Sequence, residues 1–174
     1  MSFFFGLRSL GADWQEAFRK VEQSDKDWID SFITEHWGSN IVVVNGCEYF
    51  PSQLEGFIAS HHSEKIGLIT YLIHDLRCEI ITLNSIIEGR GIGSRLLKLT
   101  ENEAVKNNCK SIWLITTNDN LHAIEFYQKL GYSLIKVHKN AVEISRELKP
   151  EIPQIGYNGI PITDELEFVK NICR

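Results

Sequence analysis

The chain has 174 residues, of which 43% are hydrophobic, 24% charged and 10% aromatic, an ordinary globular composition. This length fits a single domain over residues 1–174, large enough to bury a core without disulfides or metals to stabilise it. Lys and Arg number 18 against 23 Asp and Glu, so the net charge is −5. This acidity argues against a general nucleic-acid binder, which normally carries a basic face. Every apolar run is shorter than the roughly 20 residues of a membrane helix, so we expect no membrane partner.

The beginning of the chain and its cysteines favour a cytoplasmic protein. The apolar patch Phe3–Phe5 lacks the basic and long apolar regions of a secretory signal. It is interpreted as a short strand, an anchoring arm or a dimer contact, and the protein as a monomer or homodimer. Cys78 and Cys109 adjoin apolar stretches and are expected to be buried thiols in a reducing cytosol. The chain has no CxxC pair and no histidines at ligand spacing, so we expect no metal site.

The first half combines a helix with several strands. Its first part is polar and helical in character, and Ser24 or Asp25 can cap a helix that Gly38 stops after Trp37. Strand-like runs rich in β-branched residues follow at 41–44, 56–59, 66–73 and 78–83. The connector 74–77 predicts a hairpin turn. Three or four neighbouring strands, mainly antiparallel, are therefore expected.

The second half alternates between the two element types. The expected helix, strand, helix and two strands lie at 91–107, 111–116, 120–130, 132–137 and about 141–144. This order implies a crossover unit, so the fold class is α/β (mixed), with both antiparallel and parallel strand pairs. Three of the four prolines fall after residue 149, which predicts a core of about 16–148 and a proline-rich C-terminal arm over 149–174. We expect the arm to be extended and irregular to about residue 162, and the segment 163–168 to return as a short strand or helix.

A glycine-rich turn between a predicted strand and helix favours a pyrophosphate site. Glu88 is followed by Gly-Arg-Gly-Ile-Gly-Ser-Arg, and the first N–H groups of the helix lack partners within it and lie at the positive end of its dipole. Gly91 and Gly93 remove side chains where a phosphate approaches, while Arg90 and Arg95 add positive charge. A plain strand-to-helix turn that uses glycine for its geometry is the alternative. The pattern is neither a Walker loop nor a full dinucleotide fingerprint.

A second segment carries a longer motif. It has the form Asn-x-x-Ala-x-x-Phe-Tyr-x-Lys-x-Gly-Tyr and runs from Asn120 to Tyr132. Together with the glycine turn, it resembles the GNAT superfamily of acetyl-CoA-dependent N-acetyltransferases, over about residues 56–137. The resemblance implies a central mixed sheet of about six to seven strands, mainly antiparallel with one parallel splayed pair, flanked by about four helices.

The resemblance also implies acetyl-CoA as co-substrate, without a metal, and direct transfer of its acetyl group to an uncharged primary amine. The amides of about Gly89 to Ser94 would hold the pyrophosphate, the Leu83 backbone N–H would meet the acetyl oxygen, and Ser85 would lie beside the pantetheine arm. Asn120 would cap its helix and touch that arm. The residues assigned to the cofactor in this way are Leu83, Ser85, Gly89, Arg90, Gly91, Ile92, Gly93, Ser94, Arg95 and Asn120.

Two residues are candidates for proton transfer. Tyr127 matches the family's usual general acid, which protonates the leaving thiolate, and a core or rim tyrosine is the alternative. Glu79 is the candidate base, because it precedes Leu83 by four residues and the two-residue period of a strand predicts the same face for both. A carboxylate paired with a structural Arg or Lys is the alternative for Glu79. Trp37 is interpreted either as lining the acceptor pocket or as core.

Glu88 and Trp14 are two further positions that bear on the cofactor and acceptor sites. Glu88 stands where the family usually has Gln or Arg, so we expect it to turn outward with Arg90 or Arg95 offsetting its charge. Trp14, like Trp37, is a candidate for the acceptor pocket.

Three functions remain open at this point. The first is an acetyltransferase acting on a small amine, and the second is a protein or peptide N-acetylator. The third is a non-catalytic acyl-CoA-binding or regulatory module that has kept the fold. The acceptor is unidentified, and its site is expected in the first 60 residues and the C-terminal arm.

Overall fold

The computed structural model describes residues 15–172, which form a seven-stranded sheet, a two-stranded hairpin and four α-helices. The sheet strands are β1 (Glu16–Lys20), β4 (Glu55–His61), β5 (Glu64–His74), β6 (Arg77–Ser85), β7 (Ser111–Thr117), β8 (Ser133–His138) and β9 (Glu165–Asn171). The hairpin strands are β2 (Val42–Val44) and β3 (Cys47–Tyr49). The helices are α1 (Lys26–Trp37), α2 (Ile92–Lys106), α3 (Leu121–Lys129) and α4 (Ala141–Leu148).

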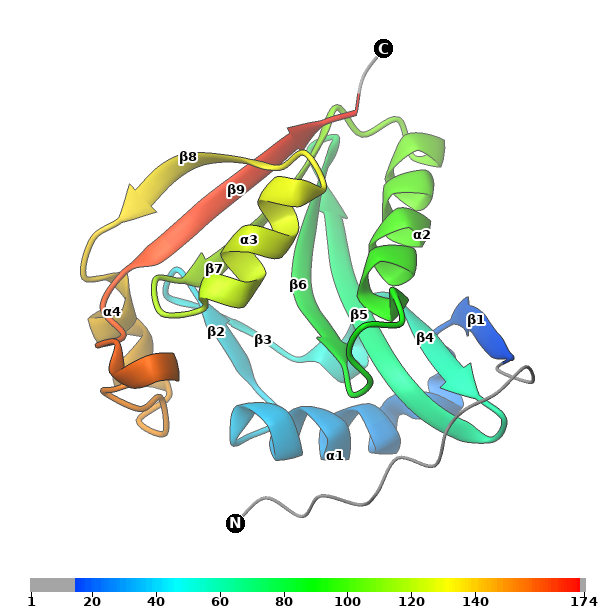
Figure 1. Cartoon of the computed structure of the whole chain (residues 1–174), viewed down its shortest axis with the longest axis horizontal. Helices are drawn as coiled ribbons and strands as arrows, with labels where there is room; N and C mark the ends of the chain where they lie inside the picture. The colour runs from blue at the N-terminus through cyan, green and yellow to red at the C-terminus, as the bar shows by residue number, and fades with distance from the viewer. Residues whose placement is uncertain (1–14, 173–174) are drawn as a thin grey trace.

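The sheet has the order β1-β4-β5-β6-β7-β9-β8 and, within the described residues, one parallel pair, β6 with β7. Pairing joins only Arg77–Ile80 of β6 to Ser111–Leu114 of β7, and beyond these residues the two strands diverge toward the lower part of Figure 1. The other strand pairs are antiparallel. The expected mixed fold, mainly antiparallel with one splayed parallel pair, is confirmed.

Each face of the sheet has its own hydrophobic core. On one face, α2 and α3 pack over buried side chains that include Ile69, Leu114 and Phe168, and both helices lie on the near side of the sheet in Figure 1. We refer to this side as the α2–α3 face. On the other side, the α1 face, Ile29 of α1 packs with Leu68 of the sheet, and side chains of the β2–β3 hairpin complete that core.

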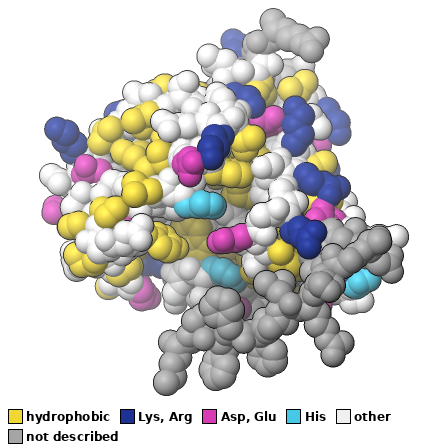
Figure 2. Space-filling view, viewed as in Figure 1, with side chains coloured by type: hydrophobic (Ala, Val, Ile, Leu, Met, Phe, Trp, Pro, Cys, Tyr) yellow, Lys and Arg dark blue, Asp and Glu magenta, His cyan; other side chains and the backbone are white. Residues whose placement is uncertain are grey.

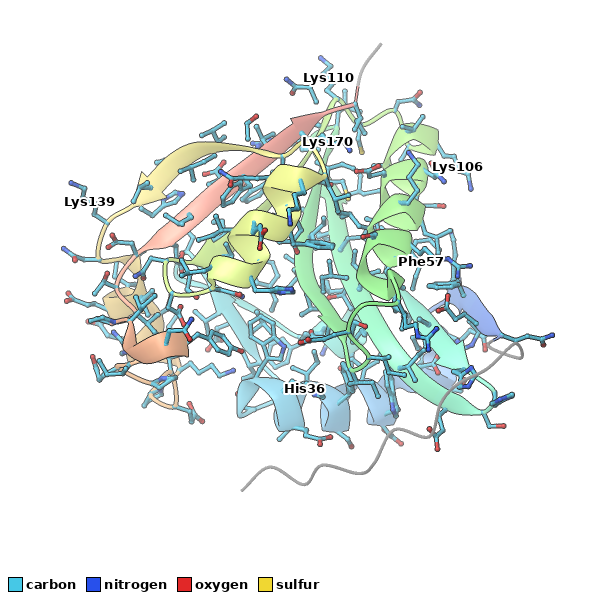
Figure 3. The ribbon with its side chains drawn as sticks, viewed as in Figure 1. His36, Phe57, Lys106, Lys110, Lys139 and Lys170 are labelled. Carbon is cyan, nitrogen blue, oxygen red and sulfur yellow. The ribbon has the colours of Figure 1, made fainter. Side chains whose placement is uncertain are left out.

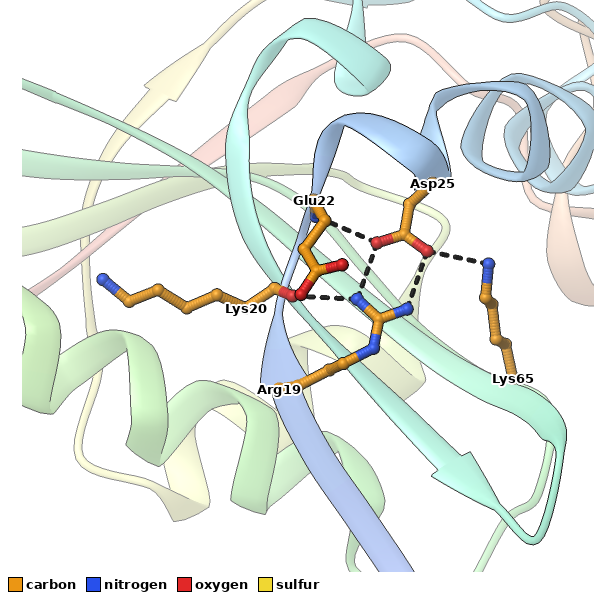
Figure 4. A network of polar contacts seen from close by, with 5 residues as sticks. All are labelled: Arg19, Lys20, Glu22, Asp25 and Lys65. Atoms are coloured by element: carbon orange, nitrogen blue, oxygen red, sulfur yellow. Dashed lines mark hydrogen bonds and ion pairs between the residues drawn. The ribbon is translucent and has the colours of Figure 1, made fainter.

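A buried carboxylate ties α1 to the sheet. Asp25 accepts hydrogen bonds from the Arg19 guanidinium at 2.6 and 2.7 Å and from the Glu22 backbone N–H at 2.9 Å, and it pairs with Lys65 at 2.8 Å (Figure 4). The bonded guanidinium holds the pKa of the Asp25 carboxyl well below its usual range. Asp25 therefore stands at the N-cap position, as one of the two predicted caps, but its side chain binds this network instead of capping the helix.

Several predicted elements match the structure. The helix ending at Trp37 is α1, with Gly38 in the left-handed conformation after it, and the helix over 91–107 is α2. The hairpin turn after His74 connects β5 to β6. Cys78 and Cys109 are buried.

Three expectations about local structure were wrong. Residues 16–20 form the edge strand β1 rather than part of a helical region, and they pair with β4 from Glu16 to Lys20. The strand predicted at about 141–144 is the helix α4, whose buried residues Ala141, Val142 and Ser145 recur at helical spacing. The strand β3 was not predicted, and it pairs with β2 across the Asn45–Gly46 turn.

The last part of the chain returns to the sheet, where 165–171 forms β9 between β7 and β8. Of the two alternatives for the segment 163–168, the structure contains the strand. The irregular residues 149–164 are anchored at both ends: Lys149 Nζ donates to the Ile41 carbonyl at 2.6 Å, and Asn118 Oδ1 accepts from the backbone N–H of Thr163 at 2.9 Å. The Phe3–Phe5 patch lies outside the described residues. Over the described range, no helix is long and apolar enough to cross a membrane.

Candidate active site

The glycine turn between β6 and α2 has open space at two of its glycines. Gly89 and Gly91 both have φ of 72°, and a Cβ placed on either would meet no atom within 4 Å. A Cβ on Gly93 would lie 3.6 Å from the Phe126 ring, so this glycine faces α3. Glu88 is exposed, in line with the expectation for it.

The turn leads directly into the first turn of α2. Gly91 is the N-cap, and the Arg95 N–H donates to the Gly91 carbonyl at 3.0 Å. The N–H groups of Ile92, Gly93 and Ser94 precede this first helical bond and have no partner within the helix. The Ile92 side chain is buried in the core of the α2–α3 face, so it anchors the start of the helix. This arrangement is suited to an anion.

The two arginines of the turn, Arg90 and Arg95, differ in their contacts. Arg95 forms an ion pair with Glu16 of β1, and its guanidinium carbon lies 4.2 Å from the centroid of the Phe18 ring. It therefore connects α2 to the edge strand. Arg90 lies in the turn itself and is exposed. Figure 2 shows basic side chains gathered along the α2 edge of the molecule, although the chain as a whole is acidic.

The open end of β6 directs two backbone N–H groups toward β7. Ile86 N donates to the Ile66 carbonyl at 3.0 Å, and the register pairs Leu83 with Ile69 and Ser85 with Gly67. Because hydrogen-bonded and non-bonded pairs alternate in an antiparallel ladder, Leu83 and Ser85 occupy non-bonded pairs with respect to β5. Their N–H groups point to the side where β7 has diverged. The Ser85 hydroxyl donates to the Ile87 carbonyl at 2.9 Å.

Tyr127 lies on the α2–α3 face, where it is 7% exposed and belongs to the same core that Leu83 packs against. Its ring contacts Phe126 and Tyr132 edge to face, with centroids 5.1 and 5.6 Å apart. Burial raises its pKa above the usual phenol value, so the hydroxyl stays protonated at physiological pH. Asn120 caps the helix that carries it, since its Oδ1 accepts from the Ala123 N–H at 3.2 Å.

Glu79 lies on the α1 face, and the prediction that it shares a face with Leu83 was wrong. The register pairs Thr82 with Thr70 and Ile80 with Tyr71, which leaves Ile81 as an extra residue in a β-bulge. The bulge reverses the two-residue alternation between Glu79 and Leu83.

The Glu79 carboxylate is 3% exposed and contacts a phenol and an imidazole rather than a Lys or Arg. The Tyr49 hydroxyl donates to it at 3.3 and 3.4 Å, and His74 Nε2 lies 3.7 Å from its Oε2. Burial raises the Glu79 pKa above its usual value, partly offset by the hydrogen bond from Tyr49 and by the charge of His74. Burial and the raised pKa both suit a carboxylate that takes up a proton.

Sequence reasoning did not assign Tyr49 or His74 to the site. Tyr49 belongs to the unpredicted strand β3, and His74 was assigned only to the predicted hairpin turn over 74–77. Trp37 Nε1 donates to Asn84 Oδ1 at 3.2 Å, so the last turn of α1 is tied to the open end of β6. His36, labelled in Figure 3, comes from the same turn, and its ring contacts Phe32 within α1. Trp14 lies outside the described residues. Between residues 15 and 172, no group of three His, Cys, Asp or Glu side chains could hold a metal.

Comparison with known proteins identifies the family. The model of the Acetyltransferase (GNAT) family matches residues 8–132. The chain belongs to the GNAT family. Among relatives of this GNAT chain, the Bacillus subtilis uncharacterized protein YxbD is 46% identical over 151 residues, covering 86% of this chain and 95% of YxbD.

Solved structures show the same GNAT fold. The IAA acetyltransferase from Bacillus cereus superposes with a TM-score of 0.71 at 16% identity, covering 91% of this chain and all of that one. A GNAT family acetyltransferase from Elizabethkingia anophelis, solved with acetyl-CoA bound, has a TM-score of 0.64 at 20% identity and covers 90% of this chain and 98% of that one. At these identities, the likeness concerns the fold.

Proposed function

We propose that this GNAT chain transfers the acetyl group of acetyl-CoA to a primary amine by direct attack of the neutral amine. One observation carries the proposal. Tyr127 and Glu79 are both buried, and they lie on opposite faces of the sheet, with Glu79 in the last paired residues of β6 before β6 and β7 diverge. Direct transfer needs a proton donor on the side of the leaving sulfur and a proton acceptor on the side of the amine.

The glycine turn fits the diphosphate of CoA. Gly89 and Gly91 leave open space beside the turn, which leads into the start of a fifteen-residue helix, and the amides of Gly89 to Ser94 would bind the phosphates there. Arg90 adds charge within the turn, while Arg95 holds α2 against β1. Bound acetyl-CoA would supply the acetyl thioester, and the acetyl-CoA-bound GNAT relative supports this choice of co-substrate.

Three groups of the chain divide the chemistry. Glu79, with its raised pKa, would accept a proton from the acceptor's ammonium group, directly or through water. The Leu83 backbone N–H, which points toward β7, would donate to the acetyl oxygen as negative charge develops on it. Tyr127 remains protonated and would donate to the sulfur as it leaves. The second N–H proton that the attacking nitrogen loses would return to the Tyr127 oxygen, so each cycle leaves one proton on Glu79. Buried cysteines such as Cys78 and Cys109 are common in proteins of a reducing compartment, so the cytoplasm is the proposed location of the reaction.

The proposal is tested by a panel of acceptors with acetyl-CoA and a thiol reagent that reports released CoA. A polyamine, an aminoglycoside, an amino-acid amide and a lysine-containing peptide represent the main classes of primary amine. We expect at least one amine to release CoA faster than the protein alone does. Preference for the peptide would identify a protein acetylator. Tight CoA binding without transfer to any amine would favour the non-catalytic module.

The phosphate site is tested separately by Gly91→Glu. A carboxylate at this position would fill the turn and repel the diphosphate, so calorimetry should show strongly weakened binding of CoA. Gly159→Glu is the matched control, because Gly159 has a φ of 74° and a Cβ placed on it, as on Gly91, would meet no atom within 4 Å. Normal CoA binding by the Gly91 variant would mean that the phosphates bind elsewhere.

A further inference from the structure

The buried base candidate has a polar neighbour that reaches solvent. His74 is the last residue of β5 and lies two residues beyond Leu72, the cross-strand partner of Glu79. The two side chains are therefore diagonal neighbours on one face of the β5–β6 hairpin. Their closest atoms, Nε2 and Oε2, are 3.7 Å apart. The Glu79 side chain is 4% exposed, whereas that of His74 is 45% exposed.

A base at this depth requires an exit for the proton. Each catalytic cycle deposits one proton on the base, and a carboxyl that is almost fully buried exchanges with bulk water only through a neighbour. Imidazole is suited to this role, because it accepts a proton at one nitrogen while releasing one from the other near neutral pH. His74 Nδ1 lies 3.6 Å from the Asp75 carboxylate, which is 96% exposed.

We propose that His74 is the proton-exit residue of this enzyme, passing to solvent the proton that Glu79 takes from the acceptor amine. This inference rests on the function proposed above. The 3.7 Å separation of Nε2 and Oε2 is slightly longer than a direct hydrogen bond, and catalytic contacts often tighten when substrate binds.

The relay balances without an oxidant or a further reactant. An N–H bond of the acceptor's ammonium breaks, and its proton binds Glu79 Oε2. That proton then passes to the Nε2 lone pair of His74 while the Nδ1 proton leaves to water at Asp75. The imidazole is neutral again but carries its proton on Nε2, the carboxylate is restored, and one proton has reached solvent. Exchange of the imidazole proton with water returns the Nδ1–H tautomer before the next cycle.

The other groups around the pair have different roles. Tyr49, from β3, donates to Glu79, and burial and the neighbouring carboxylate raise its pKa, so it does not release its proton near neutral pH. Arg77, from β6, contributes positive charge that favours the ionised form of Glu79. Asp75, from the turn between the strands, pairs with His74. Only the imidazole therefore joins the buried carboxylate to solvent within this group of described residues.

His74→Gln tests the proposal, because glutamine preserves polarity and approximate size but cannot relay a proton. We expect kcat with the fastest amine of the panel to fall by about tenfold, a smaller loss than that of Glu79→Gln, with an unchanged KM for acetyl-CoA. Added imidazole or concentrated buffer should restore kcat in His74→Gln but not in Glu79→Gln. His62→Gln, in the turn at the other end of β5, is the matched control and should behave like the unmodified protein.

Two further results separate the relay from a structural effect and from failure of the proposed function. The double variant should be no slower than Glu79→Gln alone, because both residues act on the same proton. Independently of any acceptor, urea unfolding of His74→Gln should give the same unfolding free energy as the unmodified protein, because the proposed role of His74 is in proton transfer and not in holding the fold. If Glu79→Gln is slow and His74→Gln has the wild-type kcat, the relay is overturned but the base assignment is not. The same holds if kcat falls in His74→Gln and added imidazole does not restore it. A wild-type rate for Glu79→Gln would overturn the base assignment as well, and a lowered unfolding free energy of His74→Gln would assign its slow rate to a structural effect.

Discussion

A single extra residue in β6 places Glu79 and Leu83 on opposite faces of the sheet. Without the bulge at Ile81, Glu79 and Leu83 would point to the same face, as strand periodicity predicts. With it, Leu83 packs with the core that includes Tyr127, and Glu79 faces Tyr49 across the other side. In the proposed mechanism, the bulge therefore puts the candidate base on the face opposite to the one that Tyr127 and Leu83 share.

The proposed role of Tyr127 as proton donor is tested by Tyr127→Phe, which keeps the buried ring contacts and removes only the hydroxyl. We expect kcat to fall by at least about tenfold with little change in acetyl-CoA affinity, because proton donation acts on the reaction rather than on binding. Tyr157→Phe is the control, since Tyr157 is exposed in the segment after α4. An unchanged kcat in the Tyr127 variant would remove this residue from the mechanism.

The burial of Glu79 also predicts how stability depends on pH. Its pKa is raised on folding, so its contribution to stability is complete below the unfolded carboxyl pKa of about 4.3 and is lost as pH rises through the folded pKa. Glu79→Gln, which cannot ionise, should therefore gain stability relative to wild type between about pH 4 and pH 8. Urea unfolding at both pH values measures this, and a difference in unfolding free energy that does not change with pH would show that the carboxyl is not perturbed.

At the scale of elements, α1 is held in place by charge as well as by its apolar face. The Asp25 network spans β1, the start of α1 and β5, and α1 in turn carries Trp37 to the open end of β6. Disturbing Asp25 should therefore affect both the stability of the fold and the position of the helix.

Asp25→Asn should lower the free energy of unfolding by about 2–3 kcal/mol at neutral pH, the scale of losing hydrogen bonds to a buried charged group. The Asp25 pKa is lowered on folding, so this contribution is present above the unfolded pKa and is lost as pH falls. Asp27→Asn makes the same chemical change at an exposed position of the same helix terminus and should cost less than about 0.5 kcal/mol. Equal losses in the two variants, measured by denaturant unfolding, would contradict the structural role of the network.

Elements with strong local signals could be predicted, and those that depend on distant partners could not. The apolar spacing of α1 and α2 and their glycine boundaries are contained within each segment. The short Ala-Val run at the start of α4 fits a strand or a helix equally well, and packing on β2 and β9 selects the helix. The place of β9 between β7 and β8 depends on a long return of the chain that no local pattern encodes.

For the molecule as a whole, the residues proposed to bind the cofactor follow from local sequence, whereas those around the candidate base depend on distant parts of the chain. The cofactor motifs are contiguous, from Gly89 to Arg95 and from Asn120 to Tyr132, so the sequence carries them directly. The surroundings of Glu79 come from separate parts of the chain, since Tyr49 is 30 residues away and the bulge arises from pairing with β5. The net charge of −5 likewise conceals the basic α2 edge seen in Figure 2.

The measurement that tests the central claim most directly is mass spectrometry of the acceptor amine after incubation with acetyl-CoA labelled in its acetyl group. The account predicts one labelled acetyl group on the amine nitrogen for each CoA thiol released, with no label remaining on the protein. It also predicts that this product is greatly reduced by Tyr127→Phe and by Glu79→Gln. Stable acetylation of the protein itself, or CoA binding with no labelled amine from any acceptor class, would contradict direct acetyl transfer by this chain.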